Sequence, residues 1–103
     1  MDMAKGDTIM QCSSLEEVRS NIDRIDNEII KLIAERGNCV SQASEFKKNE
    51  AGVKAPDRVE GVIAKVRKKA EEYGADTDMV EALYRQMIAS FIKIEMEEFK
   101  KTK

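Results

Sequence analysis

The chain has 103 residues, a formal net charge of −2 and no histidine, with 42% hydrophobic and 5% aromatic residues. Its length fits one domain, and one proline with five glycines gives too few turn signals for an all-β protein. The absence of histidine excludes histidine-based metal sites and histidine-dependent nucleophile triads. The nearly balanced charge gives no reason to expect a nucleic acid or an anionic membrane as partner.

Residues 1–13 are polar and aperiodic, so we expect a flexible leader there and one helical domain over residues 14–103. The leader lacks the apolar run of a signal peptide, and no segment reaches the length of a membrane span. Cys12 and Cys39 belong to no CxxC motif, which argues against a disulfide framework. We therefore expect a cytoplasmic protein.

Residues 14–47 carry the clearest pattern of the chain, because their apolar positions recur in steps of three and four. This spacing is typical of an amphipathic helix and not of a strand. The run Ser14-Leu15-Glu16-Glu17 fits a capping box, which predicts the start of the helix. The apolar stripe consists of Leu15, Val18, Ile22, Ile25, Ile29, Leu32, Val40, Ala43 and Phe46.

A loop and a second helix are expected next. Residues 49–55 are predicted to form the loop, because they include Gly52 and end before a proline. Pro56 suits the first turn of a helix, and Gly74 is a plausible C-cap, so the second helix is predicted over residues 56–73.

A third helix is predicted from about residue 78 to Phe99, with apolar residues at helical spacing along one side. Residues 76–78 offer side chains that commonly cap a helix N-terminus. Asp78 and Glu81 have the spacing of a capping box. The chain is therefore predicted to be all-α, with three helices of which the first is the longest.

The length of the first helix predicts a dimer. A helix over residues 14–47 spans about 50 Å at 1.5 Å per residue, whereas a compact domain of about 100 residues has a radius of gyration of about 13 Å. Two shorter helices of the same chain cannot cover such a stripe along its whole length. We therefore expect an intertwined homodimer in which the long helices share a seam.

Three cations interrupt the apolar stripe of the first helix. Arg36 lies in the middle of the stripe, and Arg19 and Lys47 lie on its margin. At about 100° per residue, Arg36 and Lys47 point within about 20° of the same direction, so an anionic group is expected between them. Arg19 and Lys47 taken singly fit ordinary snorkelling from a helix edge. For Arg36, the structural alternative is a salt bridge to Glu35, Asp26 or another helix, because an unpaired buried charge is costly.

Two further charged residues complete a set. Glu95 falls on the apolar face of the third helix, where it could pair with Arg36. Arg58 falls in the first turn of the second helix, where a solvated arginine is the ordinary interpretation. Together, four cations and one acid converge on the apolar surfaces of a histidine-free helical protein. Such a set could hold a small dicarboxylate without supplying an obvious nucleophile.

The order and spacing of these residues resemble the all-helical chorismate mutases over about residues 14–99. The short motifs are weak singly, and their combination is more specific. They are the R-x-x-I-D-x-I-D run at Arg19, Ile22, Asp23, Ile25 and Asp26, the run Ala34-Glu35-Arg36, then Lys47, Arg58 and Glu95.

The resemblance implies an intertwined homodimer that rearranges chorismate to prephenate by a pericyclic shift, without a cofactor or metal ion. Arg36 and Arg58 would bind the substrate carboxylates, and Arg19 would reach in from the other chain. Lys47 and Glu95 would flank the ether oxygen, where negative charge grows in the transition state.

Two positions depart from the mutase pattern. Many bacterial mutases carry glutamine where Glu95 falls, and a carboxyl group can donate a hydrogen bond to the ether oxygen only when protonated. Val59 stands where such mutases tend to have an acid for the ring hydroxyl. Residues 22–26, 43–47 and 55–59 are closer to the isochorismate–pyruvate lyase branch, whose members form salicylate and pyruvate in the same pocket.

The function expected from the sequence is therefore chorismate mutase activity on a small-molecule substrate, in a homodimer. The close alternative is isochorismate–pyruvate lyase activity in the same pocket. A third possibility, of a different class, is a non-catalytic helical dimerisation or regulatory module whose cations form only structural salt bridges.

Overall fold

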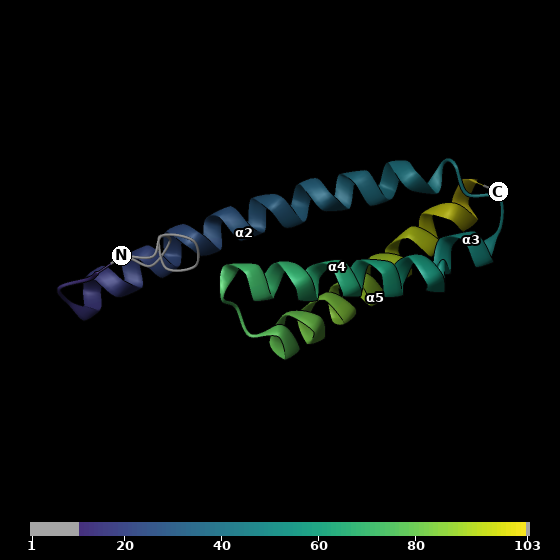
Figure 1. The fold of residues 1–103 in the computed structure, drawn as a ribbon. Helices are drawn as coiled ribbons and strands as arrows, with labels where there is room; N and C mark the ends of the chain where they lie inside the picture. The colour runs from purple at the N-terminus through teal and green to yellow at the C-terminus, as the bar shows by residue number, and fades with distance from the viewer. Residues whose placement is uncertain (1–10, 103) are drawn as a thin grey trace.

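The computed structural model describes residues 11–102, and in this part of the chain all regular structure is helical. The helices are α2 (Leu15–Ser44), α3 (Glu50–Lys54), α4 (Pro56–Tyr73) and α5 (Thr77–Thr102) (Figure 1). The predicted all-α class, with one long N-terminal helix, is confirmed. Most of the predicted flexible leader, residues 1–10, lies outside the described residues and stays a prediction.

Helix α2 begins where the capping pattern predicts. The Ser14 side chain accepts a hydrogen bond from the Glu17 backbone N–H at 3.1 Å. The Glu17 carboxylate in turn accepts from the Ser13 hydroxyl at 2.8 Å, so the neighbouring serine takes part in the reciprocal contact. The bond to Ser14 satisfies a backbone donor that has no partner within the helix.

The predicted end of the first helix is wrong by three residues, because α2 ends at Ser44 and not at Lys47. The Ser44 hydroxyl donates to the Ser41 carbonyl at 2.6 Å, and the Phe46 N–H bonds to Ala43 three residues back. Such short-range bonds tighten the last turn and compete with continued helix. Lys47 therefore leaves the helix axis and enters the connection to α3.

The predicted loop over residues 49–55 is also wrong, because most of it forms the short helix α3. The Asn49 side chain caps this helix by accepting from the Gly52 N–H at 2.8 Å. Val53, only 2% exposed, packs in the core, and α3 contacts α5. Ala55 then adopts a left-handed φ of 36°, and Pro56 opens α4 as predicted.

The ends of α4 and α5 follow the capping signals only in part. Gly74 ends α4 with φ 77°, as expected for a left-handed C-cap. Asp76 caps α5, since its side chain accepts from the Met79 N–H at 2.8 Å. The expected box between Asp78 and Glu81 is not formed, because both carboxylates accept hydrogen bonds from an arginine of α4.

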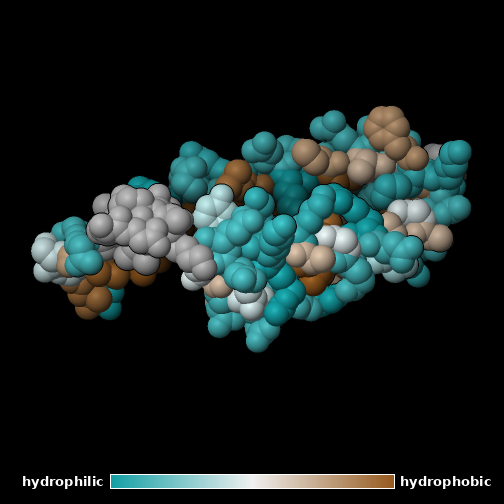
Figure 2. Space-filling model, viewed as in Figure 1, coloured by the Kyte–Doolittle hydropathy of each residue, from teal (hydrophilic) through white to brown (hydrophobic). Residues whose placement is uncertain are grey.

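Helix α5 is the centre of the fold, because α2, α3 and α4 all contact it. The largest exposed apolar stretch lies on α2, whose N-terminal part runs past the other helices (Figure 1). Apolar side chains reach the surface near that end of the molecule (Figure 2). The radius of gyration of 17.2 Å exceeds the value of about 13 Å for a compact chain of this size. The buried apolar core consists of Val53, Ile63, Ala70, Ile88 and Phe99.

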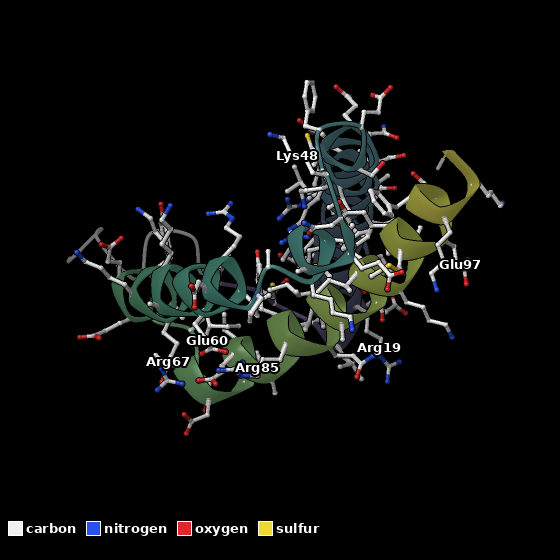
Figure 3. All side chains as sticks on the ribbon, turned by 90° about the vertical axis from the view of Figure 1, so that its right-hand side faces the viewer. Arg19, Lys48, Glu60, Arg67, Arg85 and Glu97 are labelled. Carbon is white, nitrogen blue, oxygen red and sulfur yellow. The ribbon has the colours of Figure 1, made fainter. Side chains whose placement is uncertain are left out.

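A network of ion pairs on the outside joins α4 to α5 (Figure 3). Arg85 donates to both oxygens of Glu60, at 2.8 and 2.9 Å, and to Glu81 at 2.7 Å. These hydrogen bonds from Arg85 lower the pKa of Glu60 and of Glu81, and Arg67 adds to the effect on Glu81. Glu60 and Arg85 are exposed, and Arg67 and Glu81 are half-exposed, so the network contributes little to the free energy of unfolding.

Within the described part of the chain, no helix is long and apolar enough to cross a membrane. The same residues contain no group of three or more cysteine, aspartate or glutamate side chains placed to hold a metal ion.

Candidate active site

A pocket of about 340 Å³ lies where the C-terminal half of α2 meets α3, α4 and α5. Its walls are largely apolar, with charged groups at separate points around them. Concave apolar sites with a few fixed polar groups are the usual form of small-molecule sites. The lining residues are Arg36, Cys39, Val40, Ala43, Lys47, Val53, Lys54, Ala55, Arg58, Val59, Val62, Ile88, Phe91, Ile92 and Glu95.

Four of the five site residues expected from the sequence line this pocket: Arg36, Lys47, Arg58 and Glu95. The fifth, Arg19, does not. It is exposed near the start of α2, and the helix between it and Arg36 is unbroken. The two arginines are therefore about 25 Å apart along one helix, too far for one small ligand to contact both in the same chain.

Lys47 and Glu95 form the most buried polar pair of the pocket. The Lys47 ammonium donates to a Glu95 carboxylate oxygen at 3.1 Å and to the Gly52 carbonyl at 3.1 Å. Glu95 is only 5% exposed, and a buried carboxylate is stabilised by a paired cation such as Lys47. The anion expected between Arg36 and Lys47 is thus supplied by α5, and it contacts Lys47.

Arg36 is half-buried and is held differently. Its guanidinium carbon lies 5.4 Å from the centre of the Phe91 ring and 5.9 Å from that of Tyr84. Among the ion pairs of residues 11–101, none involves Arg36, so the structural alternative, a salt bridge to Glu35, Asp26 or Glu95, is not formed. The guanidinium therefore keeps an unneutralised positive charge in the pocket.

The sequence analysis did not identify two features of the pocket, the lining residue Lys54 and the carbonyl that holds Lys47. Lys54 ends α3 beside the pocket and adds a fourth cation to its lining. Lys54 was not predicted because residues 49–55 were expected to form a loop, in which the direction of a side chain cannot be predicted. The Gly52 carbonyl, which holds Lys47, had no sequence signal at all.

The pocket therefore combines four cations, one carboxylate that already has a partner, and apolar walls. Clefts of one charge sign with low-dielectric walls concentrate ligands of the opposite charge. Fixed arginines suit carboxylates, which they can bind through two parallel hydrogen bonds. The described residues of the pocket include no cysteine or serine with a histidine base, so the arrangement favours binding, orientation and charge stabilisation.

Fold and pocket together describe an all-helical protein with a cation-lined pocket of a size and charge that suit a small anionic ligand. The chorismate mutase type II family model matches residues 18–96, and the chain belongs to this family. The family resemblance predicted from the sequence is thereby confirmed.

Named relatives fall into both branches that the sequence indicated. The chain is 36% identical over 92 residues to an isochorismate pyruvate lyase of Pseudomonas aeruginosa, covering 89% of this chain and 91% of that protein. It is 34% identical over 76 residues to a chorismate mutase of Methanocaldococcus jannaschii, covering 72% of this chain and 76% of that protein. It also matches a T-protein of Haemophilus influenzae at 33% identity over 76 residues, 73% of this chain and 20% of that protein.

Proposed function

We propose that this protein rearranges chorismate to prephenate in the pocket between α2, α3, α4 and α5. The observation that carries the proposal is the gathering of Arg36 and Arg58 around half-buried Lys47 and buried Glu95, within apolar walls. Chorismate carries two carboxylates, one on the ring and one on its flexible enolpyruvyl side chain, and the two arginines supply a separate cation for each. Holding the two ends in a reactive geometry lowers the barrier by orientation.

Lys47 is the proposed donor to the ether oxygen. An ammonium group has three N–H donors, and two of them are directed to Glu95 and to the Gly52 carbonyl. The third is left for the ligand. A donor fixed in this way stabilises the charge that grows on the oxygen as the C–O bond breaks. Glu95 would add a second donor only in its protonated form.

The proposed active unit is a homodimer with Arg19 supplied by the second chain. The apolar face around Arg19 is exposed, with Ile22 49% and Ile25 44% accessible in the single chain. A contiguous exposed apolar face marks an interaction surface. An antiparallel pair of α2 helices would cover this face on both chains and would carry each Arg19 toward the other chain's pocket.

Elimination of pyruvate from isochorismate is the second candidate reaction. Val59 lines the pocket where an acid would bind the ring hydroxyl of chorismate, so the wall there is apolar. The similarity to the lyase of Pseudomonas aeruginosa extends over 89% of the chain. Both reactions need the same carboxylate cations and the same donor to the breaking C–O bond.

The test is a paired assay of the purified protein with chorismate and with isochorismate, scored for prephenate, salicylate and pyruvate. We expect prephenate from chorismate as the main product. Salicylate and pyruvate formed faster from isochorismate would assign the chain to the lyase reaction. If a folded dimer forms none of these products, the remaining interpretation is the non-catalytic dimerisation or regulatory module.

Mixing two inactive variants tests the shared site directly. Arg36→Ala and Arg19→Ala should each lower turnover by a factor of about 10² to 10³, because each removes a charge contact to the reacting ligand. Unfolded and refolded together in equal amounts, they should regain about a quarter of wild-type turnover, because half of the dimers carry one intact site. Lys31→Ala, an exposed cation of α2 outside the pocket, is the matched control. No recovery on mixing would contradict the shared site.

A further inference from the structure

Two aromatic rings of α5 lie against the guanidinium of Arg36. The distances from its central carbon to the ring centres are 5.9 Å for Tyr84 and 5.4 Å for Phe91. These two residues are two helical turns apart, so they project from the same side of α5. Both rings and Arg36 are half-buried, which places the contact between the helices and not on the open surface. Cation–π attraction at this distance is well established.

The rings hold the guanidinium without neutralising it. A carboxylate partner would cancel the charge of Arg36, as Glu95 does for Lys47 at 3.1 Å. An aromatic face attracts a cation through its quadrupole, and the net charge of the pair stays positive. The pocket thus contains one cation whose charge is balanced and one whose direction is fixed while its charge stays free for an anion.

The backbone next to Arg36 is adapted to the same ring. A Cβ atom at Gly37 would lie 3.1 Å from Cε1 of Phe91, closer than nearly all such contacts. The absence of a side chain at Gly37 therefore lets the Phe91 ring lie close against α2 beside Arg36. A Cβ atom at this position would require the ring to shift by a few tenths of an ångström. This is a second observation, independent of the ring distances, for the same arrangement.

We propose that Tyr84 and Phe91 are positioning residues for Arg36, with Gly37 making room for the Phe91 ring. The rings fix the guanidinium fork toward the pocket and leave its charge available to a carboxylate of the ligand. The last part of this proposal rests on the proposed function, because it takes Arg36 as the residue that binds a substrate carboxylate.

Tyr84 gives the cleaner test of the two rings. Phe91 lines the pocket, so its loss would change both Arg36 and the wall that the ligand contacts. Tyr84 is absent from the lining, and its ring lies against Arg36, which does line the pocket. A change in ligand binding on substitution of Tyr84 therefore reports on the arginine.

The kinetic measurement compares Tyr84→Leu with Tyr84→Phe. With the substrate that the wild type converts, Tyr84→Leu should raise KM by about threefold to tenfold with little change in kcat, since one ring contact to Arg36 is lost. Tyr84→Phe keeps the ring and should keep the wild-type KM. Tyr73→Leu, which removes an exposed tyrosine at the end of α4, is the matched control and should change neither constant.

The second measurement needs no turnover. The heteronuclear NOE of the Arg36 Nε–H group, recorded by NMR on the free dimer, should be that of an ordered side chain in the wild type and in Tyr84→Phe. It should fall in Tyr84→Leu and in Gly37→Ala. If Tyr84→Leu does not fold, Gly37→Ala and Phe91→Leu carry the same comparison.

The outcomes separate the two proposals. An unchanged KM and an ordered Arg36 in Tyr84→Leu would overturn the positioning role, whatever the enzyme's reaction. If the Arg36 side chain is ordered in the wild type and mobile in Tyr84→Leu, the result would support the role of the rings. This holds even if the wild type converts neither chorismate nor isochorismate. That second result would refute the proposed function alone.

Discussion

The two halves of α2 have similar apolar spacing, but the N-terminal half is exposed to solvent and the C-terminal half is covered by other helices. In the N-terminal half, Ile22, Ile25 and Ile29 are 44–49% exposed in the single chain. In the C-terminal half, Val40 is half-buried and Ser44 is buried against neighbouring helices. The Ser41 hydroxyl there donates to Glu98 of α5 at 2.5 Å, which ties the two helices together.

This contrast shows that a periodic pattern predicts which face of a helix is buried and does not predict what covers that face. The spacing of apolar residues identifies the face of a helix that leaves water, because burial is favourable for any apolar partner. It does not identify the chain that supplies the partner. One half of α2 is covered by α5 of its own chain, and for the other half we propose a second copy.

The largest effect is expected from a charge placed in the exposed N-terminal half of α2. Ile25→Glu should dissociate the proposed dimer and abolish turnover with it, because each pocket would lose the Arg19 of the other chain. Sedimentation velocity and the product assay should show both losses together. Asn27→Glu adds the same charge at an exposed polar position of α2 and should change neither. A monomeric Ile25→Glu variant with full activity would contradict the shared site.

A pair of matched truncations should separate the two regions by their dependence on protein concentration. Ile63→Ala removes a side chain that is 4% exposed in α4 and should cost about 2–5 kcal/mol of unfolding free energy. We expect that loss to be the same at all concentrations. The loss for Ile25→Ala should shrink on dilution, because it acts through association, which stabilises neither protein once both are monomeric. Chemical denaturation at two protein concentrations measures both, and equal behaviour of the two variants would argue against the interface.

Within the covered half, one substitution tests whether a donor is needed at position 95. An ionised carboxylate can only accept a hydrogen bond, whereas an amide always offers an N–H donor. Glu95→Gln should therefore match or exceed wild-type turnover in the product assay, and Glu95→Ala should fall well below both. A Glu95→Gln variant as slow as Glu95→Ala would argue against a donor at this position.

The smallest effect is expected at the outer ion network. The pKa of Glu60 lies below its ordinary value of 4.5 because of the hydrogen bonds from Arg85. The stabilisation it gives is therefore complete at neutral pH and disappears as the pH falls through the lowered pKa. Glu60→Gln should lower the thermal unfolding midpoint slightly at neutral pH, and this difference should vanish in acid and shrink with salt. Glu71→Gln, an exposed glutamate of α4, is the control.

Local signals made most of the helices predictable. Ser14, Pro56 and Gly74 act within one turn of their own positions, so the ends that they set could be read from the sequence. Helix α3 could not, because five residues form a stable helix only when a side chain such as Val53 is buried by another helix.

The site divides in the same way. The charged residues Arg36, Lys47 and Glu95 stood out because they interrupt apolar stripes. Their partners were less visible: the pairing of Glu95 with Lys47, and the rings on Arg36, depend on how α5 crosses α2. Contacts between residues far apart in the sequence leave no spacing to detect.

The backbone conformation of Ala55 sets the angle between α3 and α4, which carry two cations of the pocket, Lys54 and Arg58. Lys54 ends α3 and Arg58 lies in the first turn of α4, so this one residue is the joint between them. Its φ of 36° is a conformation in which a side chain is strained and glycine is not. Glycine would make the same bend with more freedom in the unfolded chain and at the joint itself. By keeping a methyl group there, the chain accepts local strain and gains a stiff hinge, so the backbone positions from which Lys54 and Arg58 extend are set before an anion arrives.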